Sequence, residues 1–549
     1  MDLLRLNQHR EKGKRLAEIV RILGRYGLAD WFDKIPSQPV RDLLVSKETQ
    51  AIADLPVGER LRLALAELGT TFIKMGQVLS TRADLVGPDI AMELRKLQAD
   101  TPPDTAETVR QTILDELGEV PGELFAECEA EAFSSASVGQ VHRARLANGQ
   151  QVVVKVQHAG IQEKVRIDLE LLETLAKLLQ EHVPEARNYQ PVATTREFRR
   201  TLLRELDFTC ERSNMETFTR NFEGDETVHI PMVVKDRSSK RVLTMELLSG
   251  IPGSESEKLA AAGVDLDHLA RDAAMIFMNM IFRDGFYHAD PHPGNFMVLA
   301  GGVVGLLDCG MVGRLDDATH ELFEDLLLML MHRDAEGLSD TLLRVGSAPA
   351  DVDRVAFRAD VSDLLIQYGS QSLADFDLGG AMDQLFDIVR RHHVVMPSAA
   401  SLLLKTLVML EGTARLLNPN FSINEVITPF RDQLIRSRLD PKRLTRHLRQ
   451  SMRDVDRLMR NGPRNIADIL DRAQSGKFQI QHEVNHLELV ANRVVGGLLI
   501  ASLLVASALL LSHQVPPRLF GESVLGGLGF FIAAGFGARL LWRIRKDIR

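Results

Sequence analysis

Two long apolar runs near the C-terminus restrict what this chain can fold into. Val494 to Leu511 is 18 residues long and carries no charge. At about 1.5 Å per residue, a helix of that length crosses most of a hydrocarbon layer about 30 Å thick. Val524 to Trp542 is a second run, whose only charge, Arg539, lies near its end. The two runs predict a transmembrane helical hairpin at 492–549, with a buried helical hairpin of a soluble domain as the alternative.

The residues around the second run suggest an orientation. Residues 543–549 include four basic side chains, and the excess of Lys and Arg on the cytoplasmic side of membrane helices places this end in the cytoplasm. With two spans, the large N-terminal part would be cytoplasmic too. Gly529, Ala533 and Gly537 form a stripe of small residues, which suits close helix packing and permits a homodimer through the membrane helices.

Composition excludes several other classes of protein. The 549 residues are 45% apolar and 26% charged, with a net charge of −9. These values are typical of globular proteins and argue against a disordered chain or a nucleic-acid-binding protein. Cys128, Cys210 and Cys309 are far apart, so there is no CxxC metal site and no disulfide framework.

Two basic segments could contact anionic lipid. In residues 1–58, Leu16, Ile19 and Val20 share one face of a predicted helix that is rich in Lys and Arg. Such a helix can lie on a membrane surface, or it can dock on its own domain. Residues 431–460 carry ten basic and four acidic residues. They fit either a solvated helix surface or a contact with an anionic membrane. The second interpretation is favoured by the apolar runs that follow closely.

The spacing of apolar residues changes along the chain between residue 59 and the C-terminal apolar runs, and these changes suggest domain boundaries. Residues 59–130 predict helices, whereas 131–248 predict a mixed lobe. In that lobe, Asn148-Gly149 is a strong hairpin turn between the strands Val138–Leu146 and Gln151–Gln157. A helical lobe is predicted over residues 249–430, and its first residues, 249–253, look like a linker. Residues 431–491 are predicted to be a basic helical linker. The predicted class is therefore α+β, with two lobes preceded by a helical extension.

The most specific pattern is the loop His288–Asn295, which reads HADPHPGN. Asp290 and Asn295 are five apart, as in the catalytic loop of protein kinases, where the Asp faces the acceptor and the Asn holds Mg²⁺. Asp308 follows thirteen residues later, where kinases place the metal-binding Asp of D-F-G. A zinc site at the two histidines is the alternative, but oxygen ligands lie beside them and no cysteine pair completes a tetrahedron.

Upstream residues fit the same chemistry. Lys155 lies within an apolar strand run. It either binds nucleotide phosphates and pairs with a helical Glu, or it is a surface lysine on an edge strand. The loop before it, Ser134–Gln140, occupies the place of a glycine-rich phosphate loop but has one Gly, so its backbone is stiffer. Glu205 and Asp207 are two apart and cannot share one helical face, so each would meet a different partner, unless both are solvated.

Together these motifs resemble the UbiB family of atypical kinases, membrane-associated kinase-like proteins linked to ubiquinone biosynthesis. Lys74–Gln77 matches the family's K-x-G-Q signature, 133–142 its alanine-rich loop, and Glu205–Asp207 its E-x-D element. The resemblance covers about residues 61–313 and, more loosely, continues to 420. The two apolar runs match the bacterial members. One departure is Ser134-Ser135-Ala136-Ser137 in place of A-A-A-S, which leaves the preference for ATP or ADP open.

The resemblance implies roles for individual residues. Asp290 would be the base or water-orienting residue, and Lys155 and Glu211 the ion pair of the ATP site. Lys74 and Gln77 would cover the active site, with Lys74 near Glu205. Asn295 and Asp308 would hold Mg²⁺. Nucleotide would be bound by Ser134, Ser135, Ala136, Ser137, Val138, Gly139, Gln140, Val141 and His142, together with Lys155, and by Glu246 and Leu247 at the adenine-binding hinge.

The implied function is an ATPase or small-molecule kinase at the bacterial inner membrane, with its kinase-like part in the cytoplasm. The expected partners are an anionic membrane, a lipid-quinone precursor or other small-molecule acceptor, and a quinone-biosynthesis protein complex, with no nucleic acid. One alternative is a nucleotide-gated scaffold or lipid-extracting protein without enzymatic activity. Another is a conventional protein kinase, against which the added helical segment and the lack of an A-P-E element count.

Overall fold

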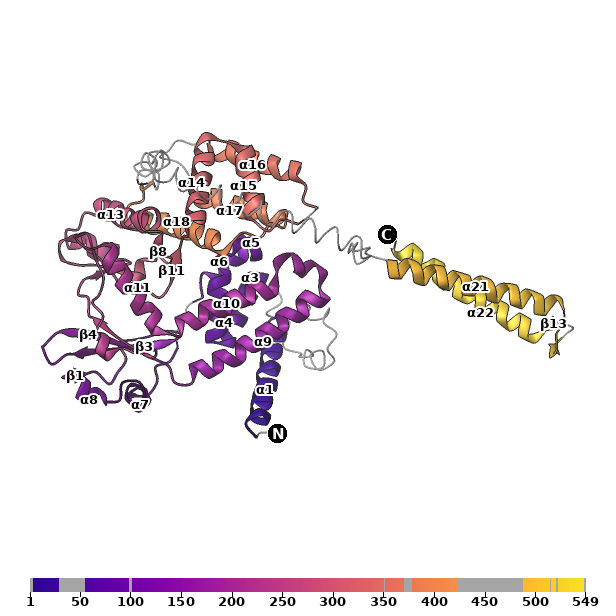
Figure 1. The fold of residues 1–549 in the computed structure, drawn as a ribbon, viewed down its shortest axis with the longest axis horizontal. Helices are drawn as coiled ribbons and strands as arrows, with labels where there is room; N and C mark the ends of the chain where they lie inside the picture. The colour runs from indigo at the N-terminus through magenta and orange to yellow at the C-terminus, as the bar shows by residue number, and fades with distance from the viewer. Residues whose placement is uncertain are drawn as a thin grey trace, which may run out of the picture. The chain divides into compact units, whose positions relative to one another are not determined.

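The computed structural model describes residues 3–28, 55–97, 101–349, 351–369, 378–422, 426, 487–513, 515–519 and 522–547 (Figure 1). The chain divides into two compact units, Met1–Asp440 and Pro441–Arg549. The basic segment at 431–460, and nearly all of the expected linker at 431–491, lie outside the described residues.

A group of N-terminal helices carries the Lys74–Gln77 motif. They are α1 (Leu3–Arg25), α3 (Val57–Leu68), α4 (Thr70–Leu79), α5 (Ala83–Val86) and α6 (Pro88–Leu94). Gly69 separates α3 from α4 with a φ of 90°, and Gly87 separates α5 from α6 with a φ of 86°. These angles favour glycine, which lacks the Cβ that would clash. The helical run expected from residue 59 is therefore present, but the glycines break it.

Helix α1 docks on the chain's own fold. Ile19 and Ile22 are buried in one apolar cluster with Leu61, Leu65 and other residues of α3, α4 and α6. Burying side chains of this size contributes about 1.5–3 kcal/mol each. Of the two interpretations of the N-terminal segment, docking is the one found in the structure.

The first lobe is built around an antiparallel sheet. Its strands are β1 (Glu127–Cys128), β2 (Ser134–Ser135), β3 (Gly139–Arg145), β4 (Gln151–Gln157) and β6 (Val242–Glu246), in the order β1-β3-β4-β6 with β2 beside β3. Lys155 on β4 lies opposite Val141 on β3 and Leu243 on β6. The lysine is therefore on a central strand, and the edge-strand alternative is wrong.

Helices cover both faces of this sheet (Figure 1). Val152, Val154 and Val156 of β4 pack with α7 (Ala106–Leu117) and α8 (Pro121–Leu124). Val153 faces the other way and packs in the cluster that contains α11 (Phe208–Asn221). Because side chains alternate along a strand, Lys155 points to the α11 side.

A helix break separates α10 from α11. The long helix α9 (Ile161–His182) is followed by α10 (Pro191–Glu205), which ends at Glu205. Asp207 then caps α11 by accepting a hydrogen bond from the backbone N–H of Thr209 at 3.0 Å. Glu205 and Asp207 thus belong to different helices, as their spacing required.

The second lobe is mainly helical. It contains α12 (Ser256–Ala261), α13 (Leu266–Met278), α14 (Asp317–His332), α15 (Ala335–Val345), α16 (Arg354–Gly369), α17 (Leu378–Arg391) and α18 (Ser398–Leu417). Short helical turns occur in both lobes at Pro184–Tyr189, Lys235–Arg237, Asn279–Arg283, Pro293–Asn295 and Ala300–Gly302.

Short strands hold the HADPHPGN loop within this lobe. One sheet has the order β5-β10-β9-β7, formed by β5 (Val228–His229), β10 (Val304–Leu306), β9 (Phe296–Val298) and β7 (Ile251–Pro252). A second sheet pairs β8 (Phe286–His288) with β11 (Val312–Arg314). The prediction of a linker at 249–253 was wrong in part, because β7 pairs with β9.

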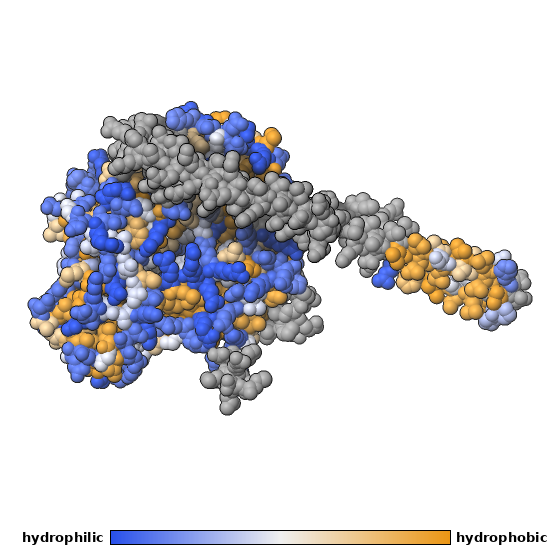
Figure 2. Space-filling model, viewed as in Figure 1, coloured by the Kyte–Doolittle hydropathy of each residue, from blue (hydrophilic) through white to orange (hydrophobic). Residues whose placement is uncertain are grey.

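The second unit is a pair of helices, α21 (Leu487–Ser512) and α22 (Val524–Asp547), joined through β12 (Arg518–Leu519) and β13 (Glu522–Ser523). Within the described residues, Val495–Ser512 is the one helical stretch long and apolar enough to cross a membrane, and Val524–Leu540 is a shorter apolar stretch. Much of the surface of the pair is apolar (Figure 2).

The small-residue stripe of α22 packs inside this pair. A Cβ on Gly529 would lie 2.4 Å from Ser507 Oγ of α21, and one on Gly537 would lie 3.7 Å from Ile500. Ala533 is fully buried. The stripe therefore serves contact between the two helices of one chain.

Candidate functional site

A lysine held by two carboxylates is at the centre of the site. The Lys155 ammonium lies 2.8 Å from Glu211 Oε2 and 3.1 Å from Oε1. It also lies 3.9 Å from Asp308 Oδ2. Alternation along β4 points Lys155 at α11, whose first turn carries Glu211. Glu211 is buried, whereas the Asp308 side chain is 52% exposed, so Asp308 has room for another ligand.

The charges of this cluster depend on one another. Burial disfavours the ammonium, but the Glu211 and Asp308 carboxylates outweigh it and raise the pKa of Lys155, which therefore stays protonated at neutral pH. Burial raises the pKa of Glu211, and Lys155 opposes that rise. The Lys155 ammonium lowers the pKa of Asp308 to about 2. Asp308 is thus a carboxylate at neutral pH.

The HADPHPGN loop is closed by its own side chains. Asn295 Nδ2 donates to Asp290 Oδ2 at 2.8 Å and to the Asp290 carbonyl at 3.0 Å. The backbone N–H of Asp290 donates to His288 Nδ1 at 3.1 Å. His288 Nε2 is therefore the protonated nitrogen, and it donates to the carbonyl of Asp308. His288 thereby couples the loop of Asp290 to Asp308.

Three side chains that sequence reasoning missed hold these two loops. Thr413 Oγ1 of α18 donates to the Pro291 carbonyl at 2.7 Å. Thr406 Oγ1 donates to the Leu402 carbonyl of its own helix at 2.8 Å and also lies 3.3 Å from the Ala289 carbonyl. Asn214 Nδ2 of α11 donates to the Cys309 carbonyl at 2.9 Å. All three are buried. Polar residues on the inward face of a helical pattern were the available signal.

The donor set fits Mg²⁺. Asn295 uses its amide nitrogen on Asp290, which leaves its oxygen without a partner among the described residues. With the Asp308 carboxylate, this gives two hard oxygen ligands, and Mg²⁺ commonly takes its remaining ligands from phosphates and water. Within the described ranges, no group of three or more His, Cys, Asp or Glu side chains is placed to hold a metal. The histidine zinc site therefore has no geometric support.

The phosphate-loop segment is a tight turn between β2 and β3. The backbone N–H of Ala136 donates to the Gly139 carbonyl at 2.9 Å. His158, another residue missed at the sequence level, lies 3.0 Å from the Ala136 carbonyl through Nε2. A Cβ on Gly139 would lie 2.5 Å from the Val156 carbonyl oxygen. The single glycine of the loop is thus required by the close approach of β4.

The expected nucleotide-binding residues differ in what they already contact. Ser137 and Val138 are buried, and Val141 lies opposite Lys155. Gln140 accepts from the backbone N–H of Asp104 at 2.5 Å and contacts His142 Nε2 at 2.8 Å. These two polar side chains therefore join the loop to the chain before it.

The residues expected at the adenine-binding hinge also have partners within the chain. The Glu246 carboxylate contacts His229 Nε2 at 3.0 Å and accepts from the backbone N–H of Met232 at 3.1 Å. The backbone N–H of Leu247 donates to the Gln151 carbonyl at 3.2 Å.

The helical extension is attached to both lobes. Lys74 of α4 pairs with Glu205 at the end of α10, and Gln77 Nε2 donates to the Leu97 carbonyl at 3.1 Å. Arg82 pairs with Asp84 at 2.8 Å and donates to the Met396 carbonyl at 3.2 Å, just before α18. The Lys74 charge also contributes to lowering the pKa of Asp308. The extension is therefore close enough to the site to act on it electrostatically.

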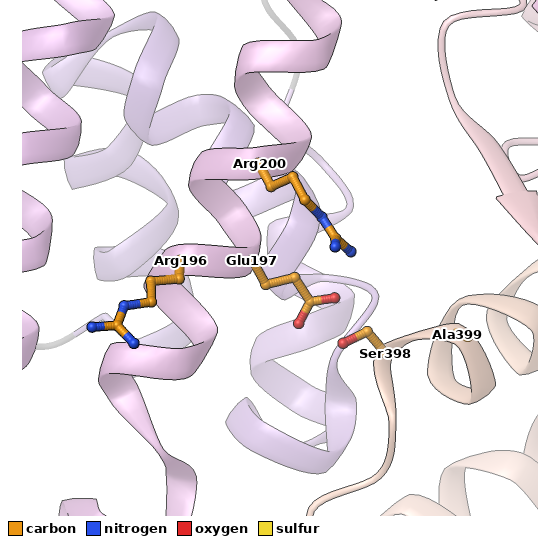
Figure 3. Close-up of a pocket in the computed structure, with 5 residues that line it drawn as sticks. All are labelled: Arg196, Glu197, Arg200, Ser398 and Ala399. Carbon is orange, nitrogen blue, oxygen red and sulfur yellow. The ribbon is translucent and has the colours of Figure 1, made fainter.

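A cavity of about 570 Å³ lies next to Arg82, which contacts two residues of its lining, Ser398 at 3.4 Å and Glu197 at 3.8 Å (Figure 3). Arg196, Glu197 and Arg200 of α10, with Ser398 and Ala399 of α18, line it. Glu197 points toward Ser398, and Arg196 points away from it. No residue of the site described above is among those that line the cavity.

An antiparallel sheet that presents a lysine to a helical glutamate, followed by a helical lobe with an Asp–Asn loop, defines a kinase-like protein. Residues 96–342 match the ABC1 atypical kinase-like domain, 361–422 the UbiB helical domain and 479–546 the ABC1/UbiB kinase-like C-terminal domain. The chain belongs to the UbiB family of atypical kinases.

Curated relatives that are named as UbiB proteins align with most of the chain. The "Probable protein kinase UbiB" of Pseudomonas aeruginosa strain LESB58 is 35% identical over 455 residues, 81% of this chain and 85% of that protein. The protein of the same name from Xanthomonas campestris pv. campestris strain 8004 is 32% identical over 517 residues, 90% of this chain and 93% of that protein. A solved structure, the Mycobacterium tuberculosis Rv3197–erythromycin complex, is 24% identical and covers 61% of this chain and 92% of that one, with a TM-score of 0.39.

Proposed function

We propose that this chain binds Mg²⁺ and ATP and acts as an ATPase or small-molecule kinase that supports ubiquinone synthesis at the bacterial inner membrane. The observation that carries the proposal is Lys155, held between Glu211 and Asp308 beside the loop of Asp290 and Asn295. This is the set of groups that phosphoryl transfer requires. Bound Mg²⁺ would neutralise phosphate charge, and Asn295 and Asp308 would hold it.

Asp290 has one oxygen available for chemistry. Its Oδ2 accepts from Asn295, whereas Oδ1 has no partner among the described residues. A carboxylate held on one side in this way can accept the proton of an attacking water or acceptor hydroxyl with the other oxygen. Lys155 would bind the α- and β-phosphates, and Glu211 would keep the lysine in place.

The acceptor is proposed to be water or a small molecule rather than a folded protein. The Lys74–Glu205 pair and the Arg82 contact with Met396 hold the extension against both lobes, which would restrict access for a protein substrate. The apolar helix α21 supports membrane anchoring and therefore a lipid-phase acceptor such as a quinone precursor. We extend the proposal to two crossings with the kinase-like unit in the cytoplasm, from the basic residues of 543–549.

The name that the curated relatives carry makes a conventional protein kinase the second candidate, and a nucleotide-gated scaffold is the third. One assay separates the three. The full chain in lipid nanodiscs is given ATP labelled on its terminal phosphate, with and without Mg²⁺ and with a phenolic quinone-precursor analogue. We expect Mg²⁺-dependent label in inorganic phosphate or the analogue. Asp308→Asn should abolish this transfer, and Asp236→Asn, an exposed aspartate outside the site, should retain it.

The other outcomes are equally defined. Label transferred to many added proteins would favour the protein kinase. ATP binding without any transfer would favour the scaffold.

A further inference from the structure

The turn between β2 and β3, within the phosphate loop, has two backbone N–H groups that are available to a ligand. Within the described residues, neither the N–H of Ser137 nor that of Val138 donates a hydrogen bond, although both residues are buried. A buried N–H group without a partner costs free energy, and phosphate oxygens are acceptors that such groups bind. The turn can therefore receive a phosphate group, provided that its peptide planes keep this orientation.

His158 fixes one of these peptide planes. Its Nε2 lies 3.0 Å from the Ala136 carbonyl oxygen, and its backbone N–H donates to the Val138 carbonyl at 3.0 Å. In a trans peptide, the carbonyl of Ala136 and the N–H of Ser137 lie in one plane and point in opposite directions. Holding that carbonyl at the imidazole therefore sets the direction of the Ser137 N–H.

Asp104, which lies just before α7, holds the other side of the imidazole. His158 Nδ1 lies 3.3 Å from Asp104 Oδ2, and the backbone N–H of Ala159 donates to the same oxygen at 2.9 Å. The backbone N–H of Asp104 donates to Gln140 Oε1 at 2.5 Å. Asp104 thus contacts both the end of the phosphate loop and the ring that holds its middle.

These neighbours favour the doubly protonated ring of His158. Nε2 faces a carbonyl oxygen and Nδ1 faces a carboxylate, and neither of these groups can donate a hydrogen bond. A neutral imidazole has a single proton, so in either tautomer one of its lone pairs faces an acceptor. Nδ1 is buried and makes no hydrogen bond within the described residues, so its contact with Asp104 is an attraction between charges that requires the protonated ring. The remaining polar neighbour, the Ser135 hydroxyl at 3.5 Å, carries no charge.

His142, a second buried histidine of this network, has the opposite arrangement. Because Gln140 Oε1 accepts from the backbone of Asp104, the Gln140 amide nitrogen faces His142 Nε2 at 2.8 Å and donates to it. His142 Nδ1 then carries the proton and donates to the Glu129 carbonyl at 2.9 Å. A neutral ring satisfies both contacts. Of these two histidines, His158 is therefore the one whose charge is tied to the loop.

We propose that His158 and Asp104 are positioning residues of the phosphate loop, and that the protonated ring holds the Ser137 N–H in the direction that binds a nucleotide phosphate. This inference rests on the function proposed above. Both side chains act through the peptide that joins Ala136 to Ser137. Loss of the ring proton ends the attraction to Asp104, so the contribution of His158 to phosphate binding decreases as the pH rises through the range in which histidine changes charge, about 5 to 8.

The test compares a ligand with phosphates and one without them at two pH values. Affinities for a non-hydrolysable ATP analogue and for adenosine are measured with Mg²⁺ on the full chain in nanodiscs, at about pH 6 and about pH 8. Each variant is compared with the wild type at the same pH, so that titration of the nucleotide cancels.

His158→Gln keeps an N–H donor for the Ala136 carbonyl but has no charge. It should weaken binding of the analogue about 3- to 10-fold at the lower pH, clearly less at the higher pH, and leave adenosine unchanged. Asp104→Asn should give the same pattern, and the double variant should bind no more weakly than either single variant. His268→Gln, which removes an exposed histidine of α13 that lies 3.5 Å from Asp272, is the matched control and should follow the wild type.

Every other outcome overturns the proposal. Equal weakening of the analogue and adenosine would assign His158 to the fold in general, and a loss that is the same at both pH values would exclude a role for its charge. Unchanged binding would show that the ring does not position the loop. If His158→Gln has no folded state by its melting curve, Asp104→Asn carries the same comparison. A wild-type chain that binds no nucleotide would refute the proposed function too, and that result appears before any variant is made.

Discussion

Arg15 of α1 and Asp168 of α9 form an ion pair that fixes the N-terminal helix to the first lobe. Arg15 Nε lies 2.7 Å from Asp168 Oδ1, and the carboxylate is fully buried. Thr71, at the start of the helix that carries Lys74, donates to the other oxygen of Asp168 at 2.7 Å. Arg15 also donates to the Leu68 carbonyl at 2.7 Å. One buried carboxylate thus joins α1, α4 and α9.

Breaking this pair should be costly from either side. Arg15→Met leaves a buried carboxylate without its cation, and we expect a loss of about 3–5 kcal/mol in the free energy of unfolding. Asp168→Asn should cost a similar amount. Chemical denaturation of the single and double variants measures the coupling. The double variant should lose clearly less than the sum, and strict additivity would show that the two residues do not interact.

Gly139→Ala should distort the phosphate loop. Its Cβ would come within 2.5 Å of the Val156 carbonyl oxygen, and forced contacts of this kind cost about 1–3 kcal/mol. We expect a lower melting temperature together with weaker nucleotide binding. Gly122→Ala is the matched control, because a Cβ there meets nothing within 4 Å. Unchanged melting and binding in Gly139→Ala would contradict the close approach of β3 and β4.

Glu211→Gln should raise the Mg²⁺ requirement of nucleotide binding. Without the Glu211 carboxylate, Asp308, 3.9 Å away, is the remaining carboxylate in contact with Lys155. The lysine would then compete with the metal for Asp308. A titration of nucleotide binding against Mg²⁺ should shift to higher concentration by several-fold, whereas Glu216→Gln on the exposed side of α11 should not shift it. An unshifted titration in Glu211→Gln would show that Glu211 does not keep Lys155 from competing with Mg²⁺ for Asp308.

Lys405→Met should stabilise the protein. The pKa of Lys405 is about 8 in the folded chain, below the ordinary 10.5 of lysine, so the unfolded chain binds more protons between these values. Wild-type stability therefore rises with pH through that window. The variant should gain on the order of 2 kcal/mol at pH 7, and the gain should shrink from pH 8 to 10.5. Thermal unfolding at several pH values measures this gain, and a pH-independent difference would show that folding does not lower the pKa of Lys405.

Local sequence patterns were sufficient for several of the elements and for the family resemblance. The turn at Asn148-Gly149 placed Lys155 on a strand, and the two-residue spacing of Glu205 and Asp207 anticipated that they meet different partners. These inferences succeeded because strand alternation and turn preferences act over a few residues.

The contacts that hold the site together join residues that are far apart in the sequence. Thr406 and Thr413 bind a loop that is 117 and 122 residues away, and Arg15 meets Asp168 across 153 residues. No periodicity links such distant positions, because they meet only after the lobes have packed.

The two threonines of α18 also set an order of events during synthesis. A ribosome releases every motif, from Lys74 through Asp308, before it has made α18. Until residues 398–417 emerge, the carbonyls of Ala289 and Pro291 lack their anchors. The nascent chain would thus carry all its signature residues while its HADPHPGN loop still lacks these contacts. The HADPHPGN loop would acquire these contacts late, with α18, the last helix of the second lobe among the residues that the structure describes.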